Sequence, residues 1–97
     1  MAYDVIIVGN GPAGLSAALY TSRANLKTLV IGKDDGALTK ADKIENYFGM
    51  AEPISGCELV ENTKKQARTL GAELMEDEIF HISRNGGFRL EGRKGVY

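Results

Sequence analysis

Residues 3–14 read YDVIIVGNGPAG, an apolar run that ends in the pattern G-x-G-x-x-G. The β-branched stretch Val5–Val8 predicts a strand that is buried on both faces. Pro12 and the alanines and leucines after it predict a helix that begins directly behind the glycines. A strand, this glycine pattern and a helix together form the arrangement that holds the pyrophosphate of a dinucleotide.

The three glycines of this pattern have separate physical roles. Gly9 permits the tight turn out of the strand, Gly11 lets backbone approach a phosphate, and Gly14 lets the helix lie close to the strand. The unpaired N–H groups of the first helical turn and the helix dipole then attract the anion. A turn with a purely structural role is the alternative. The candidate dinucleotide-binding residues are Gly9, Gly11, Pro12, Ala13 and Gly14.

A second apolar run, residues 28–31, follows at a distance that completes a βαβ unit. Dinucleotide-binding units of this kind carry an acidic residue about 20 positions after the glycines, which accepts a hydrogen bond from the ribose. Asp34 stands at that distance from Gly14, and Asp35 is the next candidate. The alternative is that both aspartates belong to a solvated turn.

The length and charge of the chain exclude several classes of protein. Its 97 residues suffice for one small domain. Lys and Arg number 12 against 13 Asp and Glu, and no basic run stands out, so we expect no nucleic-acid partner. The first apolar run is too short for a signal peptide or a membrane span, so we expect no membrane association and a cytoplasmic location.

The chain has one cysteine, Cys57, and one histidine, His81. These counts exclude an internal disulfide, a C-x-x-C redox pair and a zinc site of His and Cys ligands, and we expect no metal. We expect Cys57 to be a small packing residue, with a reactive thiol at a helix start as the alternative. We expect His81 to be structural or exposed, and we identify no catalytic residue.

A second helix is predicted from about Gly56 to Leu70. Ser55 and Glu58 form an S-x-x-E capping box at its start. Its charged stripe is interpreted as a solvated face, with docking of a partner as the alternative. The members of that stripe are Glu61, Lys64, Lys65 and Arg68.

The end of the chain is rich in strand signals. Strands are predicted at residues 72–75, 78–83 and 88–90, with Asn85-Gly86 as the hairpin turn. The fold class is therefore α/β, with a parallel βαβ core of two strands, a further helix and a β-hairpin or small meander. Because one edge of such a sheet lacks a partner, we expect low stability alone, or self-association or completion by another chain.

Longer stretches of the sequence resemble a known family. The chain is similar to the N-terminal part of the FAD-binding, Rossmann-like domain of thioredoxin-reductase-like flavoproteins, in the pyridine nucleotide-disulfide oxidoreductase group. The segments RANLKTLVIG, IENYFG and ISGCEL are the most specific to it. The resemblance covers DVIIVGNGPAG (4–14), LSAALYTSRANLKTLVIG (15–32), GALTKADKIENYFG (36–49), ISGCELVENTKKQARTLGAEL (54–74) and FRLEGRKGVY (88–97).

The resemblance implies FAD as the cofactor. The loop GNGPAG corresponds to the pyrophosphate site and Asp34 to the position that holds the adenosine ribose. The strand whose backbone meets the adenine includes Ile79. The positions implied to lie on the flavin side are Gly36, Ala37, Leu38 and Asn46.

Two departures from the family pattern concern the flavin side. Ala37 stands where the family has a glutamine, so an amide contact is lost, and Phe48 stands in place of the proline of the E-N-x-P-G motif. These departures leave the electron donor open between NAD(P)H and another donor.

The resemblance also implies that residues 1–97 are the N-terminal part of an FAD-binding domain. The rest of the FAD site, and the NAD(P)-binding domain with its redox C-x-x-C, would lie outside this chain. We therefore expect the segment of a flavin-dependent oxidoreductase that is inactive by itself. A non-catalytic nucleotide-binding module or an inactive fragment is the alternative, and the IENYFG segment argues against an NAD(P)-linked enzyme unrelated to flavin.

Overall fold

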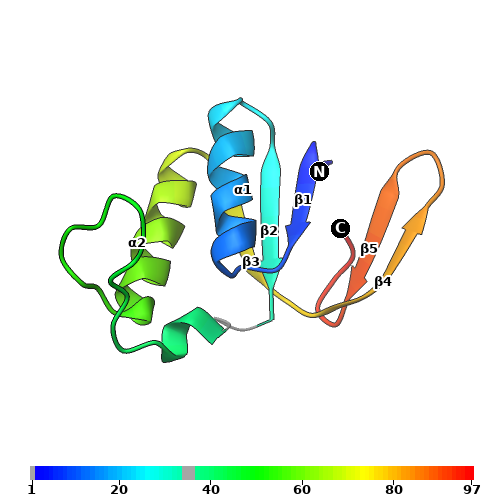
Figure 1. The fold of residues 1–97 in the computed structure, drawn as a ribbon. Helices are drawn as coiled ribbons and strands as arrows, with labels where there is room; N and C mark the ends of the chain where they lie inside the picture. Colours follow the sequence, from blue (N-terminus) through cyan, green and yellow to red (C-terminus); the bar gives the residue numbers. More distant parts are fainter. Residues whose placement is uncertain (1, 34–36) are drawn as a thin grey trace.

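The computed structural model describes residues 2–33 and 37–97 (Figure 1). Three parallel strands form one sheet in the order β1-β2-β3. They are β1 (Val5–Val8), β2 (Thr28–Gly32) and β3 (Glu73–Glu76). The α/β fold with a parallel core is thus confirmed, but the sheet has three strands where two were predicted. All five residues of β2 are buried because it lies between the other two strands.

Two helices cover one face of this sheet, α1 (Pro12–Arg23) and α2 (Gly56–Thr69) (Figure 1). The core forms where they meet it, since Leu15 and Ala18 of α1 pack with Val30 of β2 and Val60 of α2. The short 3-10 helix η1 (Ala37–Lys40) packs against α2.

The structure shortens the first helix relative to the prediction. The sequence predicts a helix through about Asn25, but α1 ends at Arg23. Asn25 has a φ of 64°, in the left-handed region, and the Leu26 N–H donates to the Thr21 carbonyl at 3.0 Å. This is the backbone conformation that commonly terminates a helix.

The antiparallel hairpin β4 (Ile79–Arg84) and β5 (Phe88–Gly92) lies on the other side of the parallel sheet from the helices (Figure 1). The turn predicted at Asn85-Gly86 joins the two strands, and Gly86 has a φ of 75° there. Tyr97 exchanges two backbone hydrogen bonds with Leu90, at 2.8 and 2.9 Å. Residues 96–97 thus pair with β5 through an isolated antiparallel bridge, so the hairpin has two strands.

A buried carboxylate fixes the junction between the two sheets. Asp77 is 4% exposed and follows β3 directly. Its oxygens accept hydrogen bonds from the Glu78 N–H at 2.7 Å, the Lys94 N–H at 3.1 Å and the Tyr97 hydroxyl at 2.8 Å. A Cβ at Gly92 would lie 2.2 Å from the Asp77 carboxylate, so only glycine leaves room for it. This junction was not predicted from the sequence.

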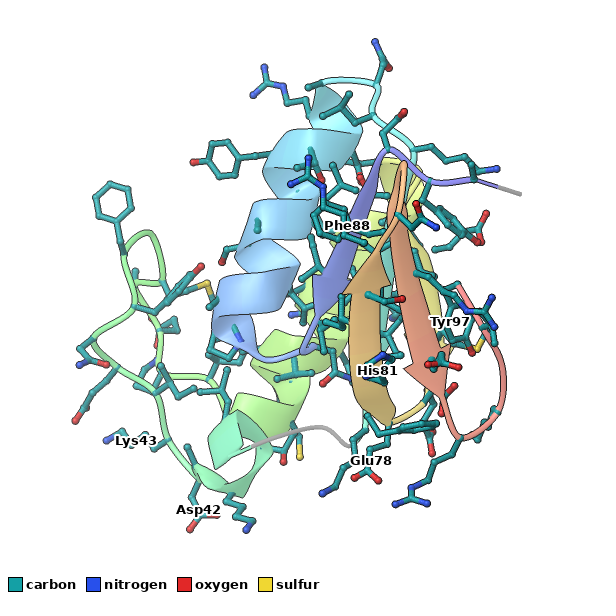
Figure 2. All side chains as sticks on the ribbon, turned by 90° about the vertical axis from the view of Figure 1, so that its right-hand side faces the viewer. Asp42, Lys43, Glu78, His81, Phe88 and Tyr97 are labelled. Carbon is teal, nitrogen blue, oxygen red and sulfur yellow. The ribbon has the colours of Figure 1, made fainter. Side chains whose placement is uncertain are left out.

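The hairpin leaves apolar side chains of β1 accessible. Ile7 packs toward the helices, whereas Ile6 and Val8 line a groove that Ile82 and Phe88 of the hairpin close from the other side. Figure 2 shows the hairpin in front of β1, with Phe88 labelled. Among the described residues, neither helix has the length and apolar character needed to cross a bilayer.

Candidate functional site

The loop between β1 and α1 begins with a glycine that the backbone requires. Gly9 has a φ of 115°, a conformation that other residues rarely adopt. Its N–H donates to the Ile31 carbonyl at 2.7 Å, so the loop is held against the carboxyl end of β2. The chain therefore turns sharply at this end of the sheet, where α/β folds bind their ligands.

Gly14 is required by packing. A Cβ on Gly14 would lie 1.9 Å from the Gly9 carbonyl oxygen and 3.2 Å from Cγ2 of Ile7. Only a hydrogen fits between α1 and the loop, which explains how the helix comes so close to the end of β1. The close approach predicted from the sequence is thus present.

Gly11 differs from both of these glycines. Its φ of −75° and ψ of −171° are open to any residue. No heavy atom of the described residues, apart from its chain neighbours, lies within 4 Å of the position that a Cβ would occupy. Neither backbone conformation nor packing against the described residues accounts for a glycine here. Among these residues, the space beside Gly11 is open.

The first turn of α1 borders this open space. No side chain of the described residues 2–33 and 37–97 caps the helix, and the first turn contains no acidic residue. Pro12 and Ala13 are exposed. The Leu15 N–H donates to the Gly11 carbonyl at 3.0 Å, which links the helix to the loop. Within the first turn itself no acidic residue neutralises the positive end of the helix dipole, so the arrangement can attract an anion.

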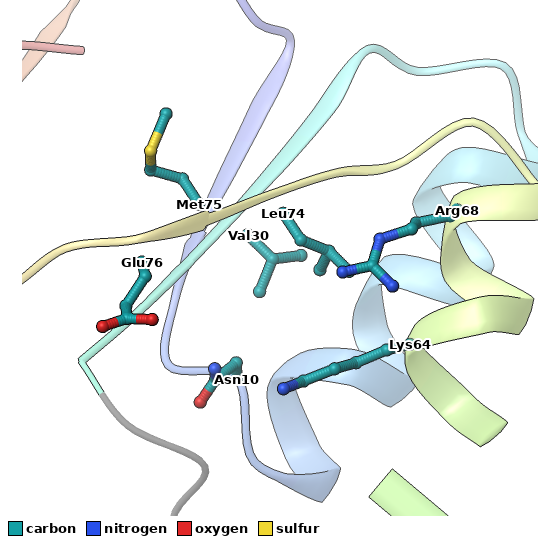
Figure 3. Close-up of a pocket in the computed structure, with 7 residues that line it drawn as sticks. All are labelled: Asn10, Val30, Lys64, Arg68, Leu74, Met75 and Glu76. Atoms are coloured by element: carbon teal, nitrogen blue, oxygen red, sulfur yellow. The ribbon is translucent and has the colours of Figure 1, made fainter. Parts of the chain in front are cut away.

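A cleft adjoins the loop on its α2 side (Figure 3). Its polar side chains come from the loop, from α2 and from β3, and they are Asn10, Lys64, Arg68 and Glu76. Asn10 is not among the residues predicted from the sequence, because it occupies a position of the glycine pattern that accepts many residues. The one signal for Asn10 in the sequence is Gly32, which ends β2 beneath the Asn10 side chain and leaves room for it.

The other predicted cofactor residues have different positions. Asp34 and Gly36, like Asp35, lie outside the described residues. Ala37 begins η1, and Leu38 is partly buried against the core cluster. Asn46 is exposed in the loop of residues 41–55, which lies beyond α2 from the sheet (Figure 1), and Ile79 begins β4. The structure thus brings Gly9–Gly14 together at one site but leaves Asn46 apart from it.

Three other predictions can be compared with the structure. Cys57 was expected to be a buried packing residue, but it is exposed, and its Sγ lies 3.4 Å from the Thr39 carbonyl oxygen. His81 is exposed as expected, with Nε2 3.9 Å from a carboxylate oxygen of Glu91. Lys64 was assigned to a solvated face, but its side chain is only 14% exposed. The helical spacing placed Lys64 with its charged neighbours, whereas β3 and the loop partly cover it.

Comparison with known proteins decides the family. The sequence profile of the pyridine nucleotide-disulphide oxidoreductases matches residues 3–95. The chain belongs to this family. It is 50% identical to a thioredoxin reductase of Treponema pallidum over 98% of this chain and 32% of the relative. It is 44% identical to a thioredoxin reductase of Aquifex aeolicus over 95% of this chain and 30% of that relative.

Solved structures of this family have the same fold. The atypical thioredoxin reductase of Desulfovibrio vulgaris Hildenborough superposes with a TM-score of 0.90 at 42% identity, covering 99% of this chain and 33% of its own. A thioredoxin reductase from Gloeobacter violaceus gives a TM-score of 0.92 at 35% identity, covering 98% and 31%. The chain thus spans about a third of the length of the family members it matches. The resemblance inferred from the sequence and its Rossmann-like fold class are confirmed.

Proposed function

We propose that this chain is the FAD-binding portion of a thioredoxin-reductase-like oxidoreductase and holds the ADP part of FAD at residues 9–14. The open space beside Gly11 carries the proposal. A glycine that neither conformation nor packing within the chain explains is accounted for by a phosphate group close to the backbone. The uncapped first turn of α1 supports the same position for the anion.

In this proposal the chain binds and orients the cofactor. FAD, when bound, supplies the electron-transfer chemistry. The first-turn N–H groups of α1 stabilise the pyrophosphate, while Gly9 and Gly14 keep the loop tight enough to present them. Asp34 would accept from the adenosine ribose, and Ile79 would lie on the strand beside the adenine. Gly36, Ala37, Leu38 and Asn46 would lie on the flavin side.

The rest of the chemistry is proposed to depend on other parts of the polypeptide or on another chain. The family members that the chain matches are about three times as long. We assign the electron donor, NAD(P)H or another, and the redox disulfide to segments outside these 97 residues. The apolar groove beside β1 supports completion of the fold by another chain or by self-association.

A visible spectrum of the purified chain, combined with titrations of FAD and ADP, tests the proposal. Flavin absorbance that remains with the protein after gel filtration is the expected result. A colourless protein that binds ADP but not FAD would favour the non-catalytic nucleotide module. Gly11→Val should abolish binding of both ligands without unfolding the chain, because a branched side chain would occupy the phosphate position. Unchanged affinity in this variant would overturn the assignment of the loop.

The role of Asp34 needs its neighbour as a matched control. Asp34→Ala should weaken ADP binding by about 1–3 kcal/mol, the range for a hydrogen bond to a charged group. Asp35→Ala removes the same charge one residue further on and should have little effect. If Asp35→Ala alone weakens binding, the ribose acceptor is Asp35.

A further inference from the structure

The cleft beside the dinucleotide loop contains a lysine whose environment is unlike that of the surface lysines. The Lys64 side chain is 14% exposed, against 68% for Lys33 and 63% for Lys43. The cleft wall, formed by α2, β3 and Asn10, accounts for this difference. Partial burial of an ammonium group removes part of its hydration, so water screens its charge less than that of an exposed lysine.

The Lys64 side chain points from α2 toward the glycine loop. In Figure 3 its ammonium end approaches Asn10, whereas Arg68, one turn further along α2, lies beside Leu74. The ammonium is 3.8 Å from a Glu61 carboxylate oxygen, and Glu61 itself is 60% exposed. Glu76 also lines the cleft. The ammonium therefore lies near one carboxylate, that of Glu61, and faces the loop.

Asn10 belongs to the loop, and its side chain lines the cleft toward which Lys64 points. A Cβ at Gly32 would lie 2.1–2.5 Å from the side-chain atoms of Asn10, so the amide occupies the space that a larger residue would fill. Asn10 stands between Gly9 and Gly11, and its position is thus fixed relative to both the loop and the cleft. In Figure 3 the Lys64 ammonium lies on the Asn10 side of the cleft, and therefore toward the backbone that presents the anion site.

We propose that Lys64 is a positioning residue that strengthens the binding of the dinucleotide phosphates at the Gly9–Gly14 loop. This inference rests on the proposed function. The ammonium adds a positive charge on the α2 side of a site where the α1 dipole already favours an anion. Because the group is partly buried, water and salt screen this charge less than that of an exposed lysine. Lys64 acts on the phosphates alone, so adenosine without phosphate should not sense it.

The experiment measures the affinity of the 97-residue chain for ADP and for adenosine at two salt concentrations. Lys64→Gln should weaken ADP binding about tenfold, the change for one charge-assisted contact, and leave adenosine binding unchanged. Added salt should weaken ADP binding less in this variant than in the wild type. Lys64→Arg keeps the charge and should retain ADP affinity. Lys65→Gln is the matched control, because Lys65 is an exposed neighbour on α2, and should have no effect.

A second variant tests the same charge without altering Lys64. Glu61→Gln removes the carboxylate 3.8 Å from the ammonium and should tighten ADP binding about twofold, as expected for loss of one exposed ion pair. The inference is overturned if Lys64→Gln binds ADP like the wild type, or if Lys65→Gln weakens binding as much. If Gly11→Val loses ADP binding and Lys64→Gln does not, the role of Lys64 is overturned and the proposed function stands. A wild-type chain that binds neither ADP nor FAD would overturn both.

Discussion

The two helices of this fold begin in opposite ways. At α2 the Ser55 hydroxyl accepts from the Glu58 N–H at 3.2 Å, and Glu58 adds a carboxylate to the first turn. At α1 no side chain caps the helix and no acidic residue stands in the first turn. A helix N-terminus has N–H groups that need partners. The Ser55 side chain supplies a partner at α2, whereas no side chain of the described residues supplies one at α1.

The glycines at these two helix starts also differ, because one is packed against the chain and the other is not. A Cβ on Gly56 would lie 1.7 Å from the Leu38 carbonyl oxygen, so this glycine exists for packing within the chain. Beside Gly11 the corresponding space is open among the described residues. A glycine at a helix start therefore indicates a ligand only when packing and backbone conformation within the chain do not require it.

The largest expected effect is on stability, at the start of α2, where Gly56 packs against the chain. Gly56→Val should reduce the free energy of unfolding by about 3 kcal/mol or more, because the clash is with backbone that cannot move aside. Urea unfolding followed by circular dichroism measures it. Gly87→Val is the control, since Gly87 is exposed with open space around its Cβ position. Similar losses in the two variants would contradict the difference between these glycines.

The next effect is on binding at the open helix start. Gly11→Asp gives α1 a capping carboxylate and so makes its start resemble that of α2. ADP affinity should fall about a hundredfold, because the carboxylate repels the phosphates and occupies their space, while the free energy of unfolding should rise by about 0.5 kcal/mol. Titration calorimetry and urea unfolding measure the two changes. Gly87→Asp adds the same charge on the hairpin and should alter neither; a loss of stability in Gly11→Asp would argue against an uncapped N-terminus.

The sequence was sufficient to predict most of the fold because local signals agreed with the tertiary contacts. The run Val5–Val8, the glycine pattern and the S-x-x-E box at Ser55 each predicted an element that the structure contains. The third parallel strand was missed as a member of the sheet. A strand of four residues with mostly exposed side chains, such as β3, carries little periodic signal about its partner.

The site was harder to predict because long-range contacts decide it. Lys64 and its exposed neighbour Lys65 look alike in the sequence, and only the position of β3 and Asn10 distinguishes them. Cys57 was expected to be buried from its residue type, yet it stands on the outer side of the first turn of α2. Asp77 lies in an acidic stretch that predicts solvation, whereas donors 17 and 20 residues away enclose it.

A smaller effect is expected at the capped helix start. Ser55→Ala removes the acceptor for the Glu58 N–H and should cost about 1 kcal/mol of stability, the usual value for loss of an N-cap. ADP affinity should not change, since this helix end is closed by the chain itself. A thermal unfolding midpoint, measured with and without ADP, separates the two effects. An equal loss of ADP affinity would show that the two helix starts are not independent.

Asp77, like the start of α2, finds its hydrogen-bond partners within the chain. Its contribution to stability should depend on pH. Burial opposes its ionisation, but the hydrogen bonds from Tyr97 and from the backbone N–H groups of Glu78 and Lys94 outweigh this and lower the pKa of the carboxyl. The hydrogen bond to Asp77, assisted by burial, raises the pKa of the Tyr97 phenol. Hydrogen bonding to Arg93 and then Lys33 lowers the pKa of Glu78 nearby.

The signs of these shifts give a stability profile with two limbs. A lowered carboxyl pKa contributes stability that is complete above the unfolded value, about 3.9, and is lost as pH falls through the folded value. A raised phenol pKa contributes stability that is complete below about 10 and is lost as pH rises through the folded value. Of the four predictions we expect this change in stability to be the smallest, because burial of Asp77 offsets part of the pKa shift caused by its hydrogen bonds.

Urea unfolding from pH 2 to 11 in a Glu78→Gln background isolates Asp77 from its titrating neighbour. Asp77→Asn should be less stable than this background at pH 7, and the difference should shrink as pH falls below 4, because protonation removes the same charge from Asp77. Tyr97→Phe should flatten the alkaline limb, leaving a remainder from Tyr3, whose pKa is raised by its hydrogen bond to Glu73. A difference between Asp77→Asn and its background that stays constant down to pH 2 would contradict an ionised, chain-satisfied carboxylate.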